Sequence, residues 1–156
     1  MEPIELLDPE GLSLANSATS KKRVLEDTAV LLARHLPASQ REPVYEKLLE
    51  RERLGSTGVG HGVALPHARV EGLERACGAF VQLHQGVDFD AIDDRPVDLV
   101  FALIVPQQAT NEHLKLLARL AALFSDAEVR RRLRHSRTAA DVLNLFGESQ
   151  QERESA

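Results

Sequence analysis

His67 follows a glycine-rich stretch and a proline, an arrangement that could present its imidazole for chemistry. The stretch from Arg51 to Arg69 has glycines at positions 55, 58, 60 and 62, whose backbone can take positive φ and let another group approach closely. Pro66 fixes its own φ and favours an extended Leu65. Imidazole is neutral and nucleophilic at about pH 7, and as a phosphoryl acceptor it forms a high-energy phosphoramidate. His67 is therefore the candidate nucleophile of a phosphoryl-transfer site.

A phosphoryl group on His67 would need donors for its oxygens and room for a partner to react in line. Glycine-rich backbone can supply N–H donors, and neighbouring hydroxyl groups can add to them. The guanidinium of Arg51 can complement the negative charge. The candidate phosphoryl-cradling residues are Ser56, Thr57, Gly58, Gly60 and Gly62.

A second histidine, His113, lies close to the predicted start of a later helix. If Thr110 caps this helix, His113 falls in the first turn, where backbone N–H groups and the helix dipole favour an anion. The two histidines could then flank one phosphoryl group, one bonded to it and one donating a hydrogen bond. The structural alternatives are a partly exposed helix residue without a role at His113 and an ordinary turn residue at His67.

Nucleotide and metal binding fit the same stretch less well. A Walker loop needs Gly-Lys followed by Ser or Thr, and no lysine lies between positions 48 and 114. The dinucleotide fingerprint fails because Val63 stands where a third glycine should follow Gly60. The six histidines include no pair spaced as in His-Glu-x-x-His. We therefore expect neither a cofactor nor a metal.

The composition limits the class of protein and its partners. The 156 residues suit one domain, and 43% apolar with 28% charged residues is ordinary globular composition. A net charge of −5 makes nucleic acid an unsuitable partner, and the basic cluster Arg130–Arg134 is most simply a solvated helix face. Cys77 lies in an apolar run, which indicates a buried and inert thiol. The N-terminus lacks the pattern of a signal peptide, and no stretch is long enough to span a membrane, so we expect a cytoplasmic protein without membrane insertion.

The elements that must position these residues can be predicted from the apolar pattern. Helical periodicity with caps or breakers predicts five helices, and short apolar runs predict the strands. The run at 97–105 is almost continuously apolar, which is typical of a central strand buried on both faces. The predicted helices begin at Ser20, at about 40, at Thr110 or Asn111, at Ser125 or Asp126 and at Thr138, and the last ends at Gly147. The predicted extended segments are 12–14, 56–59, 63–65, 76–83 and 97–105, with an acidic loop at 86–95.

The run from Arg51 to His67 closely resembles the phosphorylation site of enzyme IIA domains of the bacterial phosphoenolpyruvate-dependent phosphotransferase system, fructose/mannitol class. Further motifs are similar to the nitrogen-regulatory branch of that family, enzyme IIA-Ntr. The resemblance covers about residues 12–146. The further motifs are Ser20–Arg23, Phe89–Pro106, His113–Leu114 and Arg131–Arg134.

The resemblance implies a fold and a set of site residues. The fold would be α/β, a single domain with a mixed, roughly five-stranded sheet sandwiched between helices, in which 1–147 form the EIIA type-2 domain and 148–156 a polar flexible tail. His67 would accept the phosphoryl group, and Arg51 and His113 would line its pocket. Two residues depart from the family pattern, since His61 stands in place of a small polar residue and Ala68 in place of a frequent glycine.

The resemblance also implies partners. The donor would be the phosphohistidine of a small HPr-like carrier of the NPr type. The targets would be regulatory proteins of nitrogen and potassium control, such as components of potassium transport or sensor kinases, bound in a phosphorylation-dependent way. The alternatives are a sugar-transport IIA component that passes phosphate to a IIB domain, and a pure binding module in which His67 never reacts.

Overall fold

The computed structural model describes residues 1–109 and 111–155, with side chains to residue 152. In this part of the chain, six strands form one mixed sheet, in the order β1-β5-β6-β3-β2, with β4 also paired to β6. The strands are β1 (Leu12–Asn16), β2 (Gly58–Gly60), β3 (Val63–Ala64), β4 (His67–Val70), β5 (Cys77–Val87) and β6 (Val97–Pro106).

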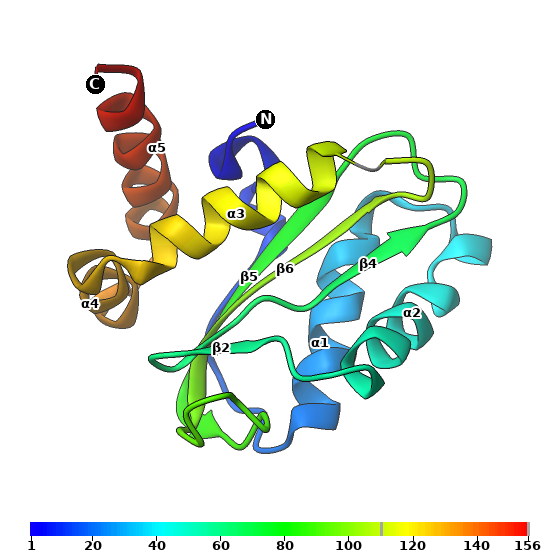
Figure 1. Ribbon diagram of the computed structural model, residues 1–156, viewed down its shortest axis with the longest axis horizontal. Helices are drawn as coiled ribbons and strands as arrows, with labels where there is room; N and C mark the ends of the chain where they lie inside the picture. Colours follow the sequence, from blue (N-terminus) through cyan, green and yellow to red (C-terminus); the bar gives the residue numbers. More distant parts are fainter. Residues whose placement is uncertain (110, 156) are drawn as a thin grey trace.

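Two helical layers cover the sheet, α1 and α2 on one face and α3, α4 and α5 on the other (Figure 1). The single α/β domain expected from the sequence is therefore confirmed. The helices are α1 (Lys21–Leu32), α2 (Glu42–Arg53), α3 (Asn111–Ser125), α4 (Ala127–His135) and α5 (Ala139–Ser155), with short 3-10 turns at Pro3–Leu6, Pro9–Gly11, Ala33–His35 and Ala38–Gln40.

Strand β6 is the centre of the core, as its continuous apolar sequence predicts. Its side chains alternate between the two helical layers. Leu99, Phe101 and Leu103 pack with α3, α4 and α5, whereas Val100 and Ala102 face α1 and α2. Each face therefore has its own apolar core, and the register of β6 fixes the register of the strands beside it.

Strands β3 and β4 are two parts of one extended segment that runs parallel to β6. Val63 pairs with Leu99, and His67 pairs with Leu103. Between the two parts, the carbonyl of Pro66 accepts a hydrogen bond from the Leu103 amide at 3.0 Å. The sequence interpretation ended the strand at Pro66 and missed β4. Proline lacks only its own N–H donor, and its carbonyl continues the pairing here.

The C-terminal helix corrects a second expectation. Gly147 was predicted to end this helix, but α5 continues through Gly147 to Ser155. The predicted flexibility of the tail 148–156 stays a prediction. Glu148 pairs with Arg132 of α4 at 2.7 Å, and the residues that follow include the good helix formers Glu and Gln. The division of the chain at residue 147 stays a prediction.

The other element ends agree well with the predicted caps. The Ser20 side chain accepts a hydrogen bond from the Arg23 amide, and the Asp126 side chain does the same for Glu128. Strand β5 extends to Val87, into the predicted acidic loop. Thr110, one of the two residues predicted to cap α3, lies outside the described residues.

Candidate functional site

The backbone around Pro66 determines which nitrogen of His67 can react. His67 Nδ1 lies 2.8 Å from the carbonyl oxygen of Leu65. A carbonyl oxygen only accepts hydrogen bonds, so Nδ1 carries the proton and Nε2 has the lone pair. Arg51 Nε donates to Nε2 at 3.3 Å. The nitrogen that carries the lone pair is therefore Nε2, and a cation already lies beside it.

Arg51 is held in place by the end of α2 and the turn that follows. Its Nη1 donates to the carbonyl of Gly55 at 2.8 Å. The next residue, Glu52, is buried and accepts hydrogen bonds from the amide and hydroxyl of Thr57. Lys21 of α1 pairs with the same carboxylate at 2.9 Å. This charged and hydrogen-bonded carboxylate ties the glycine-rich turn to α1 and α2, which fixes the position of the Arg51 backbone.

His113 comes from the opposite helical layer and meets His67 ring to ring. The ring centroids are 5.2 Å apart, with an interplanar angle of 69°. His113 is only 8% exposed, and neither of its ring nitrogens has a hydrogen-bond partner among the described residues. Buried polar atoms are nearly always hydrogen-bonded, so this imidazole fits a site that receives a transferred group or ligand.

A lowered pKa favours the neutral form of both histidines. Burial lowers the pKa of His67, and the charge of Arg51 lowers it further, against opposing effects of the Leu65 hydrogen bond and of Glu52. Burial also lowers the pKa of His113, with smaller effects of the same sign from His67 and Arg69. A neutral His67 ring with its lone pair on Nε2 is the form that can attack phosphorus.

The hydroxyl groups predicted to cradle a phosphoryl group have other partners. Ser56 donates to the carbonyl of Phe89 at 2.6 Å and accepts a hydrogen bond from the Gly58 amide at 3.0 Å. Thr57 is buried against Glu52. Among the described residues, no hydrogen bond joins any predicted cradle residue to the His67 ring, so their cradling role stays a prediction.

The glycines of the cradle set shape the hairpin between β2 and β3. Gly60 and Gly62 have φ of +100° and +80°, values that glycine adopts at little cost. A side chain on Gly58 would lie 2.8 Å from Cβ of Ala91. His61, at the tip between them, is exposed with φ of +57°, and its amide donates to Asp93. The positive φ values of Gly60 and Gly62, the close approach at Gly58 and the hydrogen bond of the His61 amide therefore account for the shape of this hairpin.

The sequence interpretation missed one cation of the site, Arg69. Side chains alternate along β4, and Ala68 and Val70 pack in the core with α1 and α2. His67 and Arg69 consequently lie on the α3 face of the sheet. Arg69 is exposed and, with Arg51, lines a cavity of about 460 Å³. The alternation would have identified it if β4 had been predicted.

Other groups singled out in the sequence lie in separate places. Burial raises the pKa of the Cys77 thiol, which contacts the carbonyl of Leu32. Within the basic cluster on α4, Arg131 and Arg134 pair with Glu128 and Asp98. In the part of the chain that the structure describes, no three His, Cys, Asp or Glu residues are grouped so that they could hold a metal ion. None of the described helices is long and apolar enough to cross a membrane.

Comparison with known proteins identifies the family of this chain. The sequence profile of the family "Phosphoenolpyruvate-dependent sugar phosphotransferase system, EIIA 2" matches residues 5–149. The nitrogen regulatory protein of Pseudomonas aeruginosa is 50% identical over 142 residues, which cover 90% of this chain and 92% of that protein. The fructose-specific EIIA component of Haloferax volcanii is 32% identical over 149 residues, or 94% of this chain and 92% of that protein.

The same family is found among solved structures. The crystal structure of nitrogen regulatory protein IIA-Ntr from Neisseria meningitidis superposes with a TM-score of 0.85 at 40% identity. The match covers 92% of this chain and 97% of that one. The chain therefore belongs to the EIIA 2 family of the phosphoenolpyruvate-dependent sugar phosphotransferase system, in its nitrogen-regulatory branch.

Proposed function

We propose that this protein is a phosphoryl carrier in which His67 Nε2 accepts a phosphoryl group from the phosphohistidine of an HPr-like carrier of the NPr type. The family is a component of a phosphotransferase system, so a transferase-type role follows from membership. The observation that carries the proposal is the pair of contacts on the His67 ring, Nδ1 to the Leu65 carbonyl and Nε2 to Arg51. They leave one nitrogen with a lone pair beside a cation.

In the proposed step, the lone pair of His67 Nε2 attacks the phosphorus of the donor. The new N–P bond forms as the donor's N–P bond breaks, and the electron pair of that bond returns to the donor imidazole. The Leu65 carbonyl keeps the proton on Nδ1 and stabilises the positive charge that develops on the ring. Arg51 then moves from the lone pair to the phosphoryl oxygens, and His113 donates a hydrogen bond to one of them.

We further propose that the phosphorylated and unphosphorylated forms bind regulatory targets differently, in the cytoplasm. The name of the Pseudomonas aeruginosa relative supports a role in nitrogen control. Potassium-transport components and sensor kinases are the target classes that the resemblance implies. A pull-down that compares wild type, His67→Ala and His67→Asp would identify which form binds.

Phosphoryl transfer itself can be tested with purified components. Incubation with phosphoenolpyruvate, an enzyme I homologue and the HPr-like carrier should add one phosphate, stable to base and labile to acid. His67→Ala should take up none, whereas His61→Ala, which changes the other histidine of the same stretch, should be labelled like wild type. Labelling of His67→Ala would overturn the assignment.

The second candidate function is that of a sugar-transport IIA component. It is favoured by the similarity to the Haloferax volcanii fructose-specific EIIA component. The phosphorylated protein would then pass its phosphate to a IIB domain, which a mixing experiment with labelled protein measures directly. Intact target binding without any phosphorylation would instead support the pure binding module.

A further inference from the structure

The proposed transfer does not use Glu52, a buried charged residue that directly follows Arg51. Its side chain is only 3% exposed, and it lies in the last turn of α2. Burial of a carboxylate is unfavourable, and a neutral pair of similar shape often stabilises a fold as well or better. Uncharged side chains with the same hydrogen bonds could therefore close the turn. This makes the charge of Glu52 a candidate for a role in the neighbouring site.

A continuous chain of hydrogen bonds leads from Glu52 to the ring of His67. The carboxylate accepts hydrogen bonds from the amide of Thr57 at 3.3 Å and from its hydroxyl. The carbonyl of Thr57 accepts one from the amide of Leu65 at 3.0 Å. The carbonyl of Leu65 in turn accepts one from His67 Nδ1 at 2.8 Å. Glu52 therefore helps to position, through two residues, the oxygen that holds the proton on the ring.

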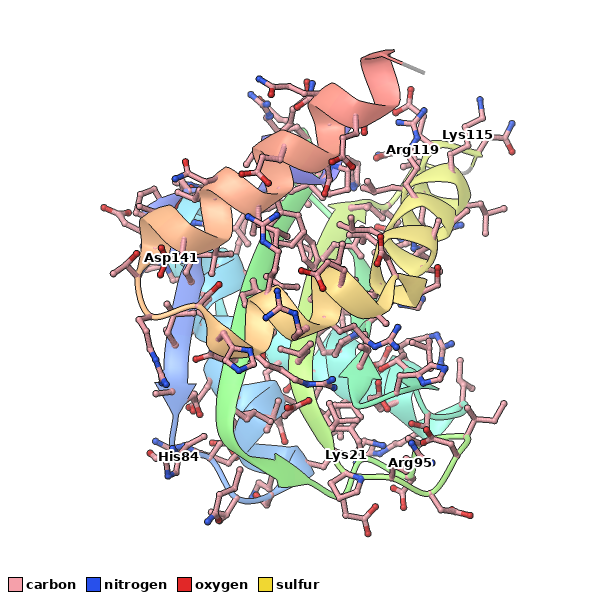
Figure 2. The ribbon with its side chains drawn as sticks, turned by 90° about the vertical axis from the view of Figure 1, so that its left-hand side faces the viewer. Lys21, His84, Arg95, Lys115, Arg119 and Asp141 are labelled. Atoms are coloured by element: carbon pink, nitrogen blue, oxygen red, sulfur yellow. The ribbon has the colours of Figure 1, made fainter. Side chains whose placement is uncertain are left out.

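Lys21 supplies the counter-charge of Glu52 from the start of α1. Its ammonium lies 2.9 Å from Glu52 Oε2, donates to the carbonyl of Phe89 at 3.3 Å and lies 4.8 Å from the centre of the Phe89 ring. Figure 2 shows Lys21 at the same end of the molecule as Arg95, which belongs to the loop between β5 and β6. The ion pair thus joins α1, α2 and this loop, which holds the carboxylate in one place.

The charge of Glu52 also acts on the His67 ring through space. Burial is the largest effect on the pKa of His67 and lowers it. The Leu65 hydrogen bond raises this pKa, the charge of Arg51 lowers it, and the charge of Glu52 raises it. A negative charge that favours a protonated imidazole also favours positive charge on that ring from any other source.

The surroundings of His67 contain few charges that could act in the same way. The other titratable groups that face the ring or line the adjoining cavity are Arg51, His113, Arg69, Lys47, Glu50 and Glu71. The first four are cationic or neutral, and the two glutamates are exposed to water, which screens their charges. Glu52 is buried, so its charge is screened less.

We infer, on the basis of the proposed function, that Glu52 with Lys21 as its counter-ion is a positioning residue that stabilises the positive charge developing on the His67 ring during transfer. As Nε2 bonds to phosphorus, Nδ1 keeps its proton, so the imidazole becomes positive. The Leu65 carbonyl meets that proton directly, and Glu52 supports the carbonyl and supplies the negative charge. Glu52 is buried and does not reach the donor, so its removal should slow the transfer step and leave binding of the carrier unchanged.

The electrostatic effect is tested on the unphosphorylated protein by an NMR titration of the His67 ring. Glu52→Gln keeps the shape of the side chain and an acceptor for Thr57 but removes the charge, so it should lower the pKa of His67. Lys21→Met/Glu52→Gln leaves no unpaired ion in the fold, and the pKa should fall less because a cation is removed as well. The control is Glu46→Gln, which changes an exposed glutamate earlier in α2 and should titrate like wild type.

Single-turnover labelling from the phosphorylated carrier separates the rate of transfer from binding. At saturating carrier, Glu52→Gln should be labelled about tenfold more slowly than wild type, because a charge that stabilises the ring is lost without the loss of a direct contact to the reacting group. The carrier concentration at half-maximal rate should not change. Glu52→Ala also removes the acceptor for Thr57 and should be slower still, whereas Glu46→Gln should be labelled like wild type.

Several results would overturn this role of Glu52. A wild-type pKa of His67 in both Glu52→Gln and the double variant would make the carboxylate a purely structural part of the turn. An unchanged maximal rate in Glu52→Gln with weaker carrier binding would place Glu52 in docking. An equal effect of Glu46→Gln would indicate long-range charge alone. Equal rates in Glu52→Ala and Glu52→Gln would refute the contribution of the hydrogen bonds.

A failure of the proposed carrier function would look different. Wild-type protein that accepts no phosphoryl group from the carrier would refute phosphoryl transfer. The NMR titration needs no carrier, so it would still show whether the charge of Glu52 acts on the His67 ring.

Discussion

At the scale of single residues, two contacts on one ring suit His67 to the proposed phosphoryl transfer. The carbonyl of Leu65 holds the proton on Nδ1, and Arg51 lies at Nε2. In the proposed transfer, the nitrogen of His67 that would attack is therefore defined before the donor binds, and the ring would need no large rearrangement. Such preorganisation lowers the activation barrier of a reaction, because the free-energy cost of positioning the groups is met during folding.

Replacement of Arg51 by alanine should slow phosphoryl transfer to His67 by about 10²-fold, since a preorganised charge at the reacting group is lost. Arg51→Lys should keep part of the rate, because a lysine supplies charge without the fork of donors. Single-turnover labelling from the phosphorylated carrier measures both. Arg53→Ala, an exposed arginine on the same helix, is the control. An equal loss in that control would mean that Arg51 serves docking rather than transfer.

Replacement of Arg69 by alanine should raise the pKa of His113. After burial and the charge of His67, the Arg69 guanidinium is a cause that lowers this pKa, so its removal lets the imidazole take up a proton more readily. Arg69→Lys keeps the charge and should leave the pKa close to that of the wild type. An NMR titration of the His113 ring distinguishes the two variants. An identical titration in Arg69→Ala and wild type would contradict the prediction.

The site could be predicted from sequence only where residue type and motif suffice. The motif placed His67 and Arg51, and helix position suggested His113. The role of Glu52 could not be inferred, because a buried carboxylate becomes visible only when its partners are brought together from α1 and the glycine-rich turn. The same holds for Arg69, whose place depends on a strand that the pattern did not reveal.

At the scale of elements, the hairpin between β2 and β3 depends on Gly62. Its φ is +80°, and a side chain there would meet Asp98 Oδ1 at 2.8 Å and Arg134 Nη2. These two groups form an ion pair, and Arg134 also donates to the carbonyl of His61 at 2.6 Å. The turn, the start of β6 and the end of α4 are thus fastened at one point.

We therefore expect Gly62→Ala to lower the free energy of unfolding by about 1–3 kcal/mol, from backbone strain and displacement of the ion pair. The matched control is Gly147→Ala. Gly147 lies within α5 with open space around it, so alanine there should raise stability by about 0.5–1 kcal/mol. Urea denaturation of both variants gives the comparison. A neutral effect of Gly62→Ala would show that the turn adapts without cost.

The elements that the sequence predicted well are those with a local signal. Helices α1 and α4 have caps and periodic apolar residues, and both begin where the caps indicate. Strand β4 is short and begins directly after a proline, so the alternation of polar and apolar residues along its four positions is a weak signal. Its existence depends on pairing with β6, which lies distant in the sequence. The extension of α5 likewise depends on a contact with α4.

At the scale of the whole molecule, the site lies where the two helical layers meet around the edge of the sheet. Arg51 comes from α2 on one face, and His113 comes from α3 on the other (Figure 1). His67 lies between them on β4, which pairs with the central strand β6. Any change that shifts one layer against the other would therefore alter the distance between the cation and the second imidazole.

Burial of two neutral histidines at this junction also makes the stability of the whole protein depend on pH. Both have a pKa below the ordinary value of 6.5, chiefly because burial disfavours the charged form. Below that value the unfolded chain binds more protons than the folded one, so protons favour unfolding. The stabilising contribution is complete above pH 6.5 and is lost as the pH falls through the folded-state pKa values.

We expect the urea midpoint of the wild type to decrease between about pH 7.5 and about pH 5.5, and to decrease less in His67→Gln/His113→Gln. The comparison uses the change with pH within each protein, so any overall cost of the substitutions cancels. Carboxylates affect the stability of the protein at lower pH. The ordinary pKa of a glutamate is 4.5, and the hydrogen bond with Arg131 lowers the pKa of Glu128 below it. Glu128 would therefore affect stability only near and below pH 4.5. An equal decrease in the double variant would show that other groups, and not the two buried imidazoles, link folding to protons in this window.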